Sequence, residues 1–163
     1  MNMVITKMKK LVVFLLMVLS LPAYSGDPYW LENRDDSQHE IDVYRSASCG
    51  CCKTWIAHLK EHNFVVKDHV LSDVAPLKEQ LGVPKKGASC HTAKINGKVI
   101  EGHVPAQDIK KVLARKDIKL LAVPGMVSGS PGMDMEEAPK HAFKVYSIDT
   151  KGQVGVFSEY SNY

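Results

Sequence analysis

The sequence has little excess charge of either sign, and it lacks the patterns of several common functional sites. Its 163 residues carry 21 lysines and arginines against 18 aspartates and glutamates. Three of the basic residues, Lys7, Lys9 and Lys10, lie near the N-terminus, so the rest of the chain is close to neutral and gives no reason to expect a nucleic-acid partner. No Ser/His/Asp arrangement, phosphate-binding glycine loop or basic stripe stands out. The sequence therefore offers no support for a serine hydrolase, a nucleotide-binding protein or a nucleic-acid-binding protein.

The sequence also lacks a typical membrane-spanning segment. The apolar run over residues 11–21, broken only by Ser20, is about half of the roughly 20 residues that a spanning helix needs. Lysines precede this run and small residues around Ser25 follow it, which is the organisation of a secretory signal peptide. We therefore predict a signal peptide over residues 1–25, an extended lead-in over 26–39 and one domain over 40–163. After cleavage, we expect an exported chain with no membrane span.

Cysteine is scarce, but three of the four cysteines fall within four residues. Cys49 and Cys52 have the C-x-x-C spacing of a thiol–disulfide centre, and Cys51 lies between them. The cluster precedes a helix-like pattern, and a helix N-terminus lowers the pKa of a nearby thiol. Three crowded thiolates repel one another unless a positive ion lies between them. A soft metal ion is the simplest candidate.

The spacing of apolar residues predicts an α/β domain. Strands are expected over residues 40–45 and 64–70, joined by a helix that begins at the cysteine cluster. A helix over residues 74–81, a hairpin over 92–102, a helix over 106–116 and a closing hairpin over 142–160 complete the order. The dipeptide Asn96-Gly97 predicts a type I′ turn in the first hairpin. This order, with a C-x-x-C between the first strand and the first helix, resembles a thioredoxin-like fold with a mixed sheet and an added C-terminal hairpin.

The fourth cysteine, Cys90, falls at a position that lies close to the dithiol in that fold. The residue just before the third strand of a thioredoxin fold, usually a cis-proline, lies against the dithiol. Here the corresponding stretch is Ser89-Cys90-His91-Thr92, which contains no proline. We therefore predict that Cys90 returns to the cysteine cluster. His91, beside it, and His103, at the end of the first hairpin, are predicted either to hold the metal ligands in place or, if the metal is copper, to bind Cu(II).

Two further histidines follow the cysteine cluster. His58 and His62 are four residues apart in the predicted helix, a spacing that suits metal binding. They should lie roughly 10 Å and 16 Å along the helix axis from Cys51. We expect both to lie on a solvated face of the helix and neither to be a ligand of the cysteine site.

Methionine is concentrated in one turn-rich segment. Met126, Met133 and Met135 lie within residues 123–135, and no other methionine follows the predicted signal peptide. The segment has no helical or strand periodicity, so these side chains have no obvious core to fill. Thioether sulfur suits Cu(I) and does not form disulfides. Met126 and Met133, both in Pro-Gly-Met sequences, are the predicted ligands, and a flexible cover over the site is the alternative.

The type of metal follows from the arrangement of the ligands. Structural zinc usually takes four ligands from separated knuckles, whereas the adjacent Cys51 and Cys52 point in different directions. Cu(I) accepts few ligands, and thiolates can bridge between copper ions, so a multinuclear Cu(I)–thiolate cluster is predicted. An iron–sulfur cluster could also be held by four cysteines, but their spacing here differs from that of the usual ferredoxins. Copper is therefore the predicted metal, and zinc is the second candidate.

Four ordered motifs resemble those of a known family. They are Cys-Gly-Cys-Cys after a Tyr-Arg-Ser strand end, Ser-Cys-His-Thr, Ile-Glu-Gly-His-Val-Pro, and Val-Pro-Gly-Met followed by Gly-Ser-Pro-Gly-Met. In this order they resemble the periplasmic copper-resistance proteins of the CopG family over about residues 41–160. The resemblance implies a thioredoxin-like fold, a periplasmic location, copper bound by the cysteines and a role in copper redox handling. Copper ions are then the expected ligands, and periplasmic copper chaperones or efflux components are the candidate partners.

The sequence leaves three functions open. The first is a copper-binding protein that interconverts Cu(I) and Cu(II), which would make it a copper oxidoreductase. The second is a metal-free thiol–disulfide oxidoreductase that uses Cys49 and Cys52, with Cys51 and Cys90 as resolving thiols. The third is copper storage or delivery without catalysis. The extra thiol and the methionine segment favour copper, because exchange chemistry needs neither. The absence of the proline that usually lies against the dithiol in this fold also argues against exchange chemistry.

Overall fold

The computed structural model describes residues 27–32, 34–135 and 137–163. The predicted signal peptide lies outside these residues. Within the described part, no helix has both the length and the apolar character needed to cross a membrane.

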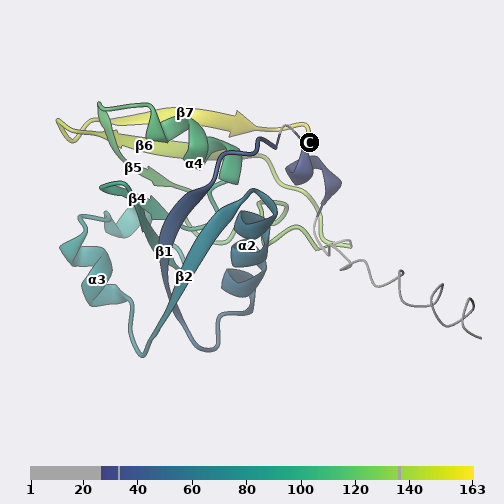
Figure 1. Ribbon diagram of the computed structural model, residues 1–163, viewed down its shortest axis with the longest axis horizontal. Coiled ribbons are helices and arrows are strands. Elements are labelled where there is room, and N and C mark those ends of the chain that lie inside the picture. The colour runs from purple at the N-terminus through teal and green to yellow at the C-terminus, as the bar shows by residue number, and fades with distance from the viewer. Residues whose placement is uncertain (1–26, 33, 136) are drawn as a thin grey trace, which may run out of the picture.

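A seven-stranded mixed sheet forms the framework of the domain, in the order β2-β1-β3-β4-β5-β6-β7 (Figure 1). The strands are β1 (His39–Ser46), β2 (Phe64–Leu71), β3 (Thr92–Ile95), β4 (Lys98–Glu101), β5 (Ile118–Ala122), β6 (Phe143–Asp149) and β7 (Val154–Tyr160). The β1–β2 and β4–β5 pairs are parallel, and the other neighbouring pairs are antiparallel. The first four strands have the thioredoxin-like order, and β6–β7 is the added hairpin. The predicted fold class is therefore confirmed.

Helices cover both faces of this sheet. They are α2 (Gly50–Glu61), α3 (Ala75–Gln80) and α4 (Ala106–Leu113), with the short 3-10 helices η1 (Pro28–Leu31) and η2 (Lys85–Gly87). Figure 1 shows α2 and α3 on either side of the β1–β2 pair. Cys52, Trp55, Ile56 and Leu59 are buried along α2, as their spacing predicted, and the last three belong to the main core. The buried face of α2 therefore fixes the position of the cysteines at its N-terminus relative to the core.

Strand β5 was missed by the sequence prediction. It is only five residues long, and its side chains are buried at every position except Lys119. A short strand that is covered on both faces lacks the alternation of apolar and polar residues that identifies a half-exposed strand. Because β5 pairs with both β4 and β6, it joins the closing hairpin to the thioredoxin-like part of the sheet.

The N-terminal lead-in is not extended throughout, which corrects the prediction for residues 26–39. Pro28–Leu31 is a 3-10 helix whose first turn is capped by the Asp27 side chain. Trp30 within it is fully buried in the main core, and its indole N–H donates to the carbonyl of Gly129 at 3.1 Å. The C-terminus lies beside this helix (Figure 1), with the Tyr163 ring 5.1 Å from that of Trp30. The lead-in therefore packs as part of the domain.

Candidate metal and thiol site

The cysteine triplet lies at the N-terminus of α2. Cys49 is the N-cap residue, and its Sγ accepts a hydrogen bond from the backbone N–H of Cys52 at 3.3 Å. Cys49 and Cys52 form a disulfide with a Cα–Cα distance of 5.4 Å. Cys51 and Cys90 are free thiols, both partly exposed. The structure thus holds one oxidised pair and two reduced sulfurs.

Cys90 returns to this triplet from the loop before β3. Its Sγ lies 3.6 Å from the Sγ of Cys51, which in turn lies 3.5 Å from the Sγ of Cys49. The sulfurs of all four cysteines, Cys52 included, lie within 4.8 Å of one another. The structure therefore brings together the four cysteines that were predicted to share one site. Their role as metal ligands stays a prediction.

Two buried histidines extend the site beyond the sulfurs. His91 Nδ1 lies 3.3 Å and His103 Nε2 lies 3.2 Å from the Sγ of Cys90. His103 Nδ1 lies 2.8 Å from the carbonyl oxygen of Pro131. Because a carbonyl can only accept, Nδ1 carries the proton and the lone pair of Nε2 faces Cys90. Cys90, His91 and His103 thus form a second group of metal-binding atoms that shares one sulfur with the first.

The site favours uncharged groups when no metal is bound. Burial raises the pKa of the Cys90 thiol to about 12, and the neighbouring Cys51 adds to this effect. Burial also lowers the pKa of His91 and of His103, because an imidazolium is poorly solvated there. Cys90 is therefore a thiol and the two imidazoles are neutral near pH 7. A metal ion that binds here displaces the thiol proton and finds the histidines already in their ligand form.

A buried ionic network fixes the segment that carries Cys90. The carboxylate of Glu101 is fully buried and accepts from the backbone N–H of Ser89 at 2.7 Å, from Lys78 Nζ at 2.5 Å and from the Thr92 hydroxyl at 2.6 Å. Sequence analysis missed these residues, because nothing in the pattern marks Glu101 at the end of a strand as buried. The network lies on the backbone next to Cys90 and holds its position relative to the sheet.

The glycine after Glu101 permits this arrangement. Gly102 has a φ of +71°, and a Cβ at this position would meet the Ser89 Cβ at 2.6 Å and the Val123 carbonyl oxygen at 2.5 Å. The Ser89–Cys90 segment can approach the end of β4 only because residue 102 has no side chain.

The methionine segment lies against both halves of the cysteine site. At its first Pro-Gly-Met turn, Gly125 donates its N–H to the carbonyl of Ala88 at 3.1 Å, and its carbonyl accepts from the Ser89 hydroxyl. At its second, a Cβ on Gly132 would lie 3.0 Å from the Cys51 carbonyl oxygen. Met126 and Met135 are mostly exposed, and Met133 is half-buried. The first turn is therefore hydrogen-bonded to the backbone beside Cys90, and the second packs closely against the backbone of Cys51.

His58 and His62 do not lie on a solvated face, which corrects the prediction. Their side chains are almost completely buried. His58 Nε2 accepts from the backbone N–H of Ala106 at 3.0 Å, and His62 Nε2 lies 2.6 Å from the carbonyl of Trp30. The packing of the lead-in and of α4 against α2 covers them, and sequence periodicity could not reveal this contact. Neither belongs to the two groups of metal-binding atoms among the described residues.

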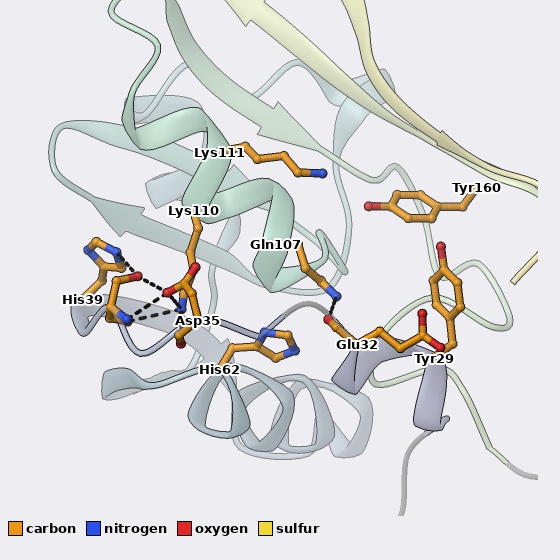
Figure 2. Close-up of a pocket in the computed structure, with 10 residues that line it drawn as sticks. Tyr29, Glu32, Asp35, His39, His62, Gln107, Lys110, Lys111 and Tyr160 are labelled. Carbon is orange, nitrogen blue, oxygen red and sulfur yellow. Dashed lines mark hydrogen bonds and ion pairs between the residues drawn. The ribbon is translucent and has the colours of Figure 1, made fainter.

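A polar pocket beside His62 is separate from the cysteine site. Tyr29, Glu32, Gln107 and Lys110 are among the residues that line it (Figure 2). Most of its hydrogen-bonding groups already have partners within the chain. Lys110 Nζ, for example, lies 2.7 Å from the carboxylate of Asp35. The pocket therefore presents no free cluster of ligand atoms comparable to the cysteine site.

A thioredoxin-like fold that gathers four cysteine sulfurs and two imidazoles at one helix N-terminus defines a protein of thiol-redox or soft-metal chemistry. Residues 87–133 match a family described as "Protein of unknown function, DUF411". Two solved structures, "Copper resistance protein copG- Form 2" and "Copper resistance protein copG- Form 1", are each 48% identical to the chain with a TM-score of 0.73. They cover 76% and 77% of this chain, and the matches span 99% and 100% of their own. No curated protein matches the chain. The chain belongs to the CopG family of copper resistance proteins.

Proposed function

We propose that the protein is an exported, periplasmic copper-binding protein of copper resistance, with Cu(I) held by Cys49, Cys51, Cys52 and Cys90. The observation that carries this proposal is the convergence of four sulfurs within 4.8 Å of one another. Thiolate is a soft ligand that suits Cu(I). The names of the two solved relatives agree with a copper-related role.

The positions of the sulfurs favour a cluster over a single ion. Cys51 lies between Cys49 and Cys90, at sulfur distances of 3.5 Å and 3.6 Å, where one thiolate can bridge two copper ions. All four cysteines can serve as ligands only after the disulfide between Cys49 and Cys52 has been reduced. Zinc remains the less favoured metal, because the adjacent Cys51 and Cys52 serve a single tetrahedral ion poorly.

The neighbouring side chains support interconversion of Cu(I) and Cu(II). Imidazole is a better ligand for Cu(II) than thioether is, and His91 and His103 face the Cys90 sulfur. Met126 and Met133 would complete the site on the Cu(I) side, since the first turn is hydrogen-bonded to the backbone beside Cys90 and the second packs against the backbone of Cys51. A site with both ligand types suits an oxidoreductase whose substrate is copper itself. Periplasmic copper chaperones or efflux components are the expected partners.

A second candidate function is thiol–disulfide exchange without metal. The observation in its favour is the disulfide between Cys49 and Cys52 at the head of α2, which is the position of the reactive dithiol in a thioredoxin-like fold. Cys52 is fully buried, whereas Cys49 is partly exposed and is therefore the sulfur that an outside thiol would attack. This function does not need Cys51, the two histidines or the methionine segment.

Metal analysis of the protein recovered from the periplasm tests these alternatives. We expect more than one copper ion per chain, an absorption spectrum typical of Cu(I)–thiolate, and an N-terminus at Gly26. The reduced protein, titrated anaerobically with Cu(I) against a chelator, should retain the metal. A metal-free protein that binds no Cu(I) but reduces a test disulfide would refute the copper proposal and support exchange chemistry.

A further inference from the structure

We propose that the Cys49–Cys52 pair is the internal electron source with which the reduced protein converts Cu(II) into Cu(I). In this reaction two Cu(II) ions gain one electron each, the two thiols of the pair lose two electrons and two protons, and one S–S bond forms. The products are two Cu(I) ions, the disulfide and two protons, so atoms and charge balance with no other reactant. This inference rests on the proposed copper-binding function and assigns the source of the electrons.

The fold accommodates the oxidised pair without loss of the rest of the site. With the Cys49–Cys52 bond in place, the Cys52 N–H donates to Cys49 Sγ, and Cys52 is fully buried at the head of the core face of α2. Cys51 and Cys90 stay reduced in the same structure, with their sulfurs 3.6 Å apart. One pair can therefore be oxidised while two thiols remain available.

The two overlapping donor groups provide a place for copper on both sides of this reaction. With the disulfide in place, the four cysteine sulfurs lie within 4.8 Å of one another, and reduction of the pair turns them into a group of four soft donors. After oxidation, Cys51 and Cys90 remain, together with His91 and His103 beside Cys90. Cys90 belongs to both groups. The two remaining cysteine sulfurs, 3.6 Å apart, are soft donors that can hold Cu(I) after the Cys49–Cys52 pair leaves the ligand set.

The surroundings of the sulfurs select the pair that is oxidised. Cys90 Sγ has two imidazole nitrogens within 3.3 Å in addition to the Cys51 sulfur, so metal binding competes with its oxidation. Cys49 and Cys52 lie one helical turn apart, and the structure holds them as a disulfide with a Cα–Cα distance of 5.4 Å, which is within the usual range for a disulfide. We therefore assign the two electrons to Cys49 and Cys52 and not to Cys51 and Cys90.

An anaerobic titration of the fully reduced protein with Cu(II) sulfate tests the assignment. We expect two Cu(I) ions per chain, measured with a Cu(I)-specific chromophoric chelator after denaturation, and the loss of two titratable thiols. Peptide mapping should place the new disulfide between Cys49 and Cys52. Cys49→Ser and Cys52→Ser should each lose the rapid formation of Cu(I) together with this disulfide. Cys51→Ser should still form the disulfide but should release its Cu(I) to a competing chelator more readily than the parent.

Three results would overturn the inference. They are four intact thiols after exposure to Cu(II), a disulfide between Cys51 and Cys90, or unchanged Cu(I) formation in Cys49→Ser and Cys52→Ser. A parallel titration with Cu(I) separates this failure from a failure of the proposed function. If the reduced protein binds Cu(I) but does not oxidise its pair, copper binding stands and the electron source is wrong. If it binds no Cu(I) at all, the copper proposal itself fails.

Discussion

The sulfur of Cys51 lies 3.6 Å from the sulfur of Cys90, although 39 positions separate the two residues in the chain. The first turn of α2 presents one of them and the loop before β3 presents the other. A plain C-x-x-C dithiol has no counterpart to this contact, because its central residues need no sulfur partner. Substitution of Cys51 is therefore the change that best distinguishes a metal-binding site from a thiol–disulfide exchange site.

Replacement of Cys51 by serine should reduce copper binding without unfolding the chain. The side chain is only partly buried, so the fold should be little affected. Loss of a bridging thiolate should remove at least one copper ion per chain or weaken Cu(I) binding by tenfold or more, which corresponds to about 1.4 kcal/mol. Elemental analysis and a chelator competition measure both effects. Parental copper content together with parental copper tolerance in Cys51→Ser would show that the cluster interpretation is wrong.

The methionine variants should weaken Cu(I) retention at small cost to stability. Met126→Leu and Met133→Leu keep the side-chain volume but remove the sulfur, so each should change the free energy of unfolding by less than about 1.5 kcal/mol. Each should also weaken Cu(I) binding or shift the copper reduction potential. Met135→Leu is the matched control, because Met135 lies outside the two Pro-Gly-Met turns. If all three variants hold copper as well as the parent protein does, the segment is only a cover. If Met126→Leu or Met133→Leu unfolds first, its methionine belongs to the core.

The two Pro-Gly-Met turns should respond differently to alanine. Gly125 and Gly132 both have positive φ, +71° and +83°, so alanine is strained at either position by roughly 1–2 kcal/mol. A Cβ at Gly125 meets no atom within 4 Å, whereas at Gly132 it would lie 2.7 Å from the backbone N of Trp55. Gly132→Ala should therefore be the more destabilising change and should also disturb copper binding near Cys51. Chemical denaturation and copper titration of both variants provide the check, and equal effects would contradict the close contact with α2.

Removal of the cation beside Glu101 should destabilise the chain strongly. Lys78 and Glu101 form an ion pair at 2.5 Å whose side chains are 13% and 0% exposed. Lys78→Met leaves the buried carboxylate without its counter-ion, at an expected cost of about 3–5 kcal/mol. Lys67→Met is the control, because its pair with Glu40 is solvent-exposed and should contribute less than about 1 kcal/mol. Urea denaturation should separate the two variants, and similar midpoints would argue against a structural role for the buried pair.

The buried His58 should make the protein less stable in mild acid. Burial lowers the pKa of His58 well below its ordinary value, and the neighbouring His62 adds to the effect. The unfolded chain takes up a proton near pH 6.5 and the folded chain does not, so the free energy of unfolding falls as the pH drops below that value. The contribution of this one group approaches about 1.4 kcal/mol per pH unit. His58→Gln should show a shallower decline in denaturation experiments between about pH 7 and pH 5.5. Equal slopes in parent and variant would mean that folding does not lower the pKa of His58.

Local chemistry was enough to predict much of this protein. The spacing of Cys52, Trp55 and Leu59 predicted a buried helical stripe, and the structure has it, because a helix repeats every 3.6 residues whatever it packs against. Asn96 and Gly97 both have positive φ, as a type I′ turn requires. The order of strands and helices, with a cysteine in place of the usual proline, also placed Cys90 beside the triplet. These features depend on residues that are close in sequence or on the known topology of one fold.

Tertiary contacts decided what the sequence pattern could not. The burial of His58 and His62 depends on the lead-in and on α4, which lie far away in the chain, so a polar residue on an apparently exposed helix face became part of the core. The burial of Glu101 depends on Lys78 and on the backbone of Ser89 in the same way. The Cys49–Cys52 disulfide also needed the folded structure, since spacing alone fits a metal knuckle as well as a bonded pair. For the two histidines and for Glu101, the deciding contribution is a contact with a segment far away in the chain, which a local sequence pattern does not reveal.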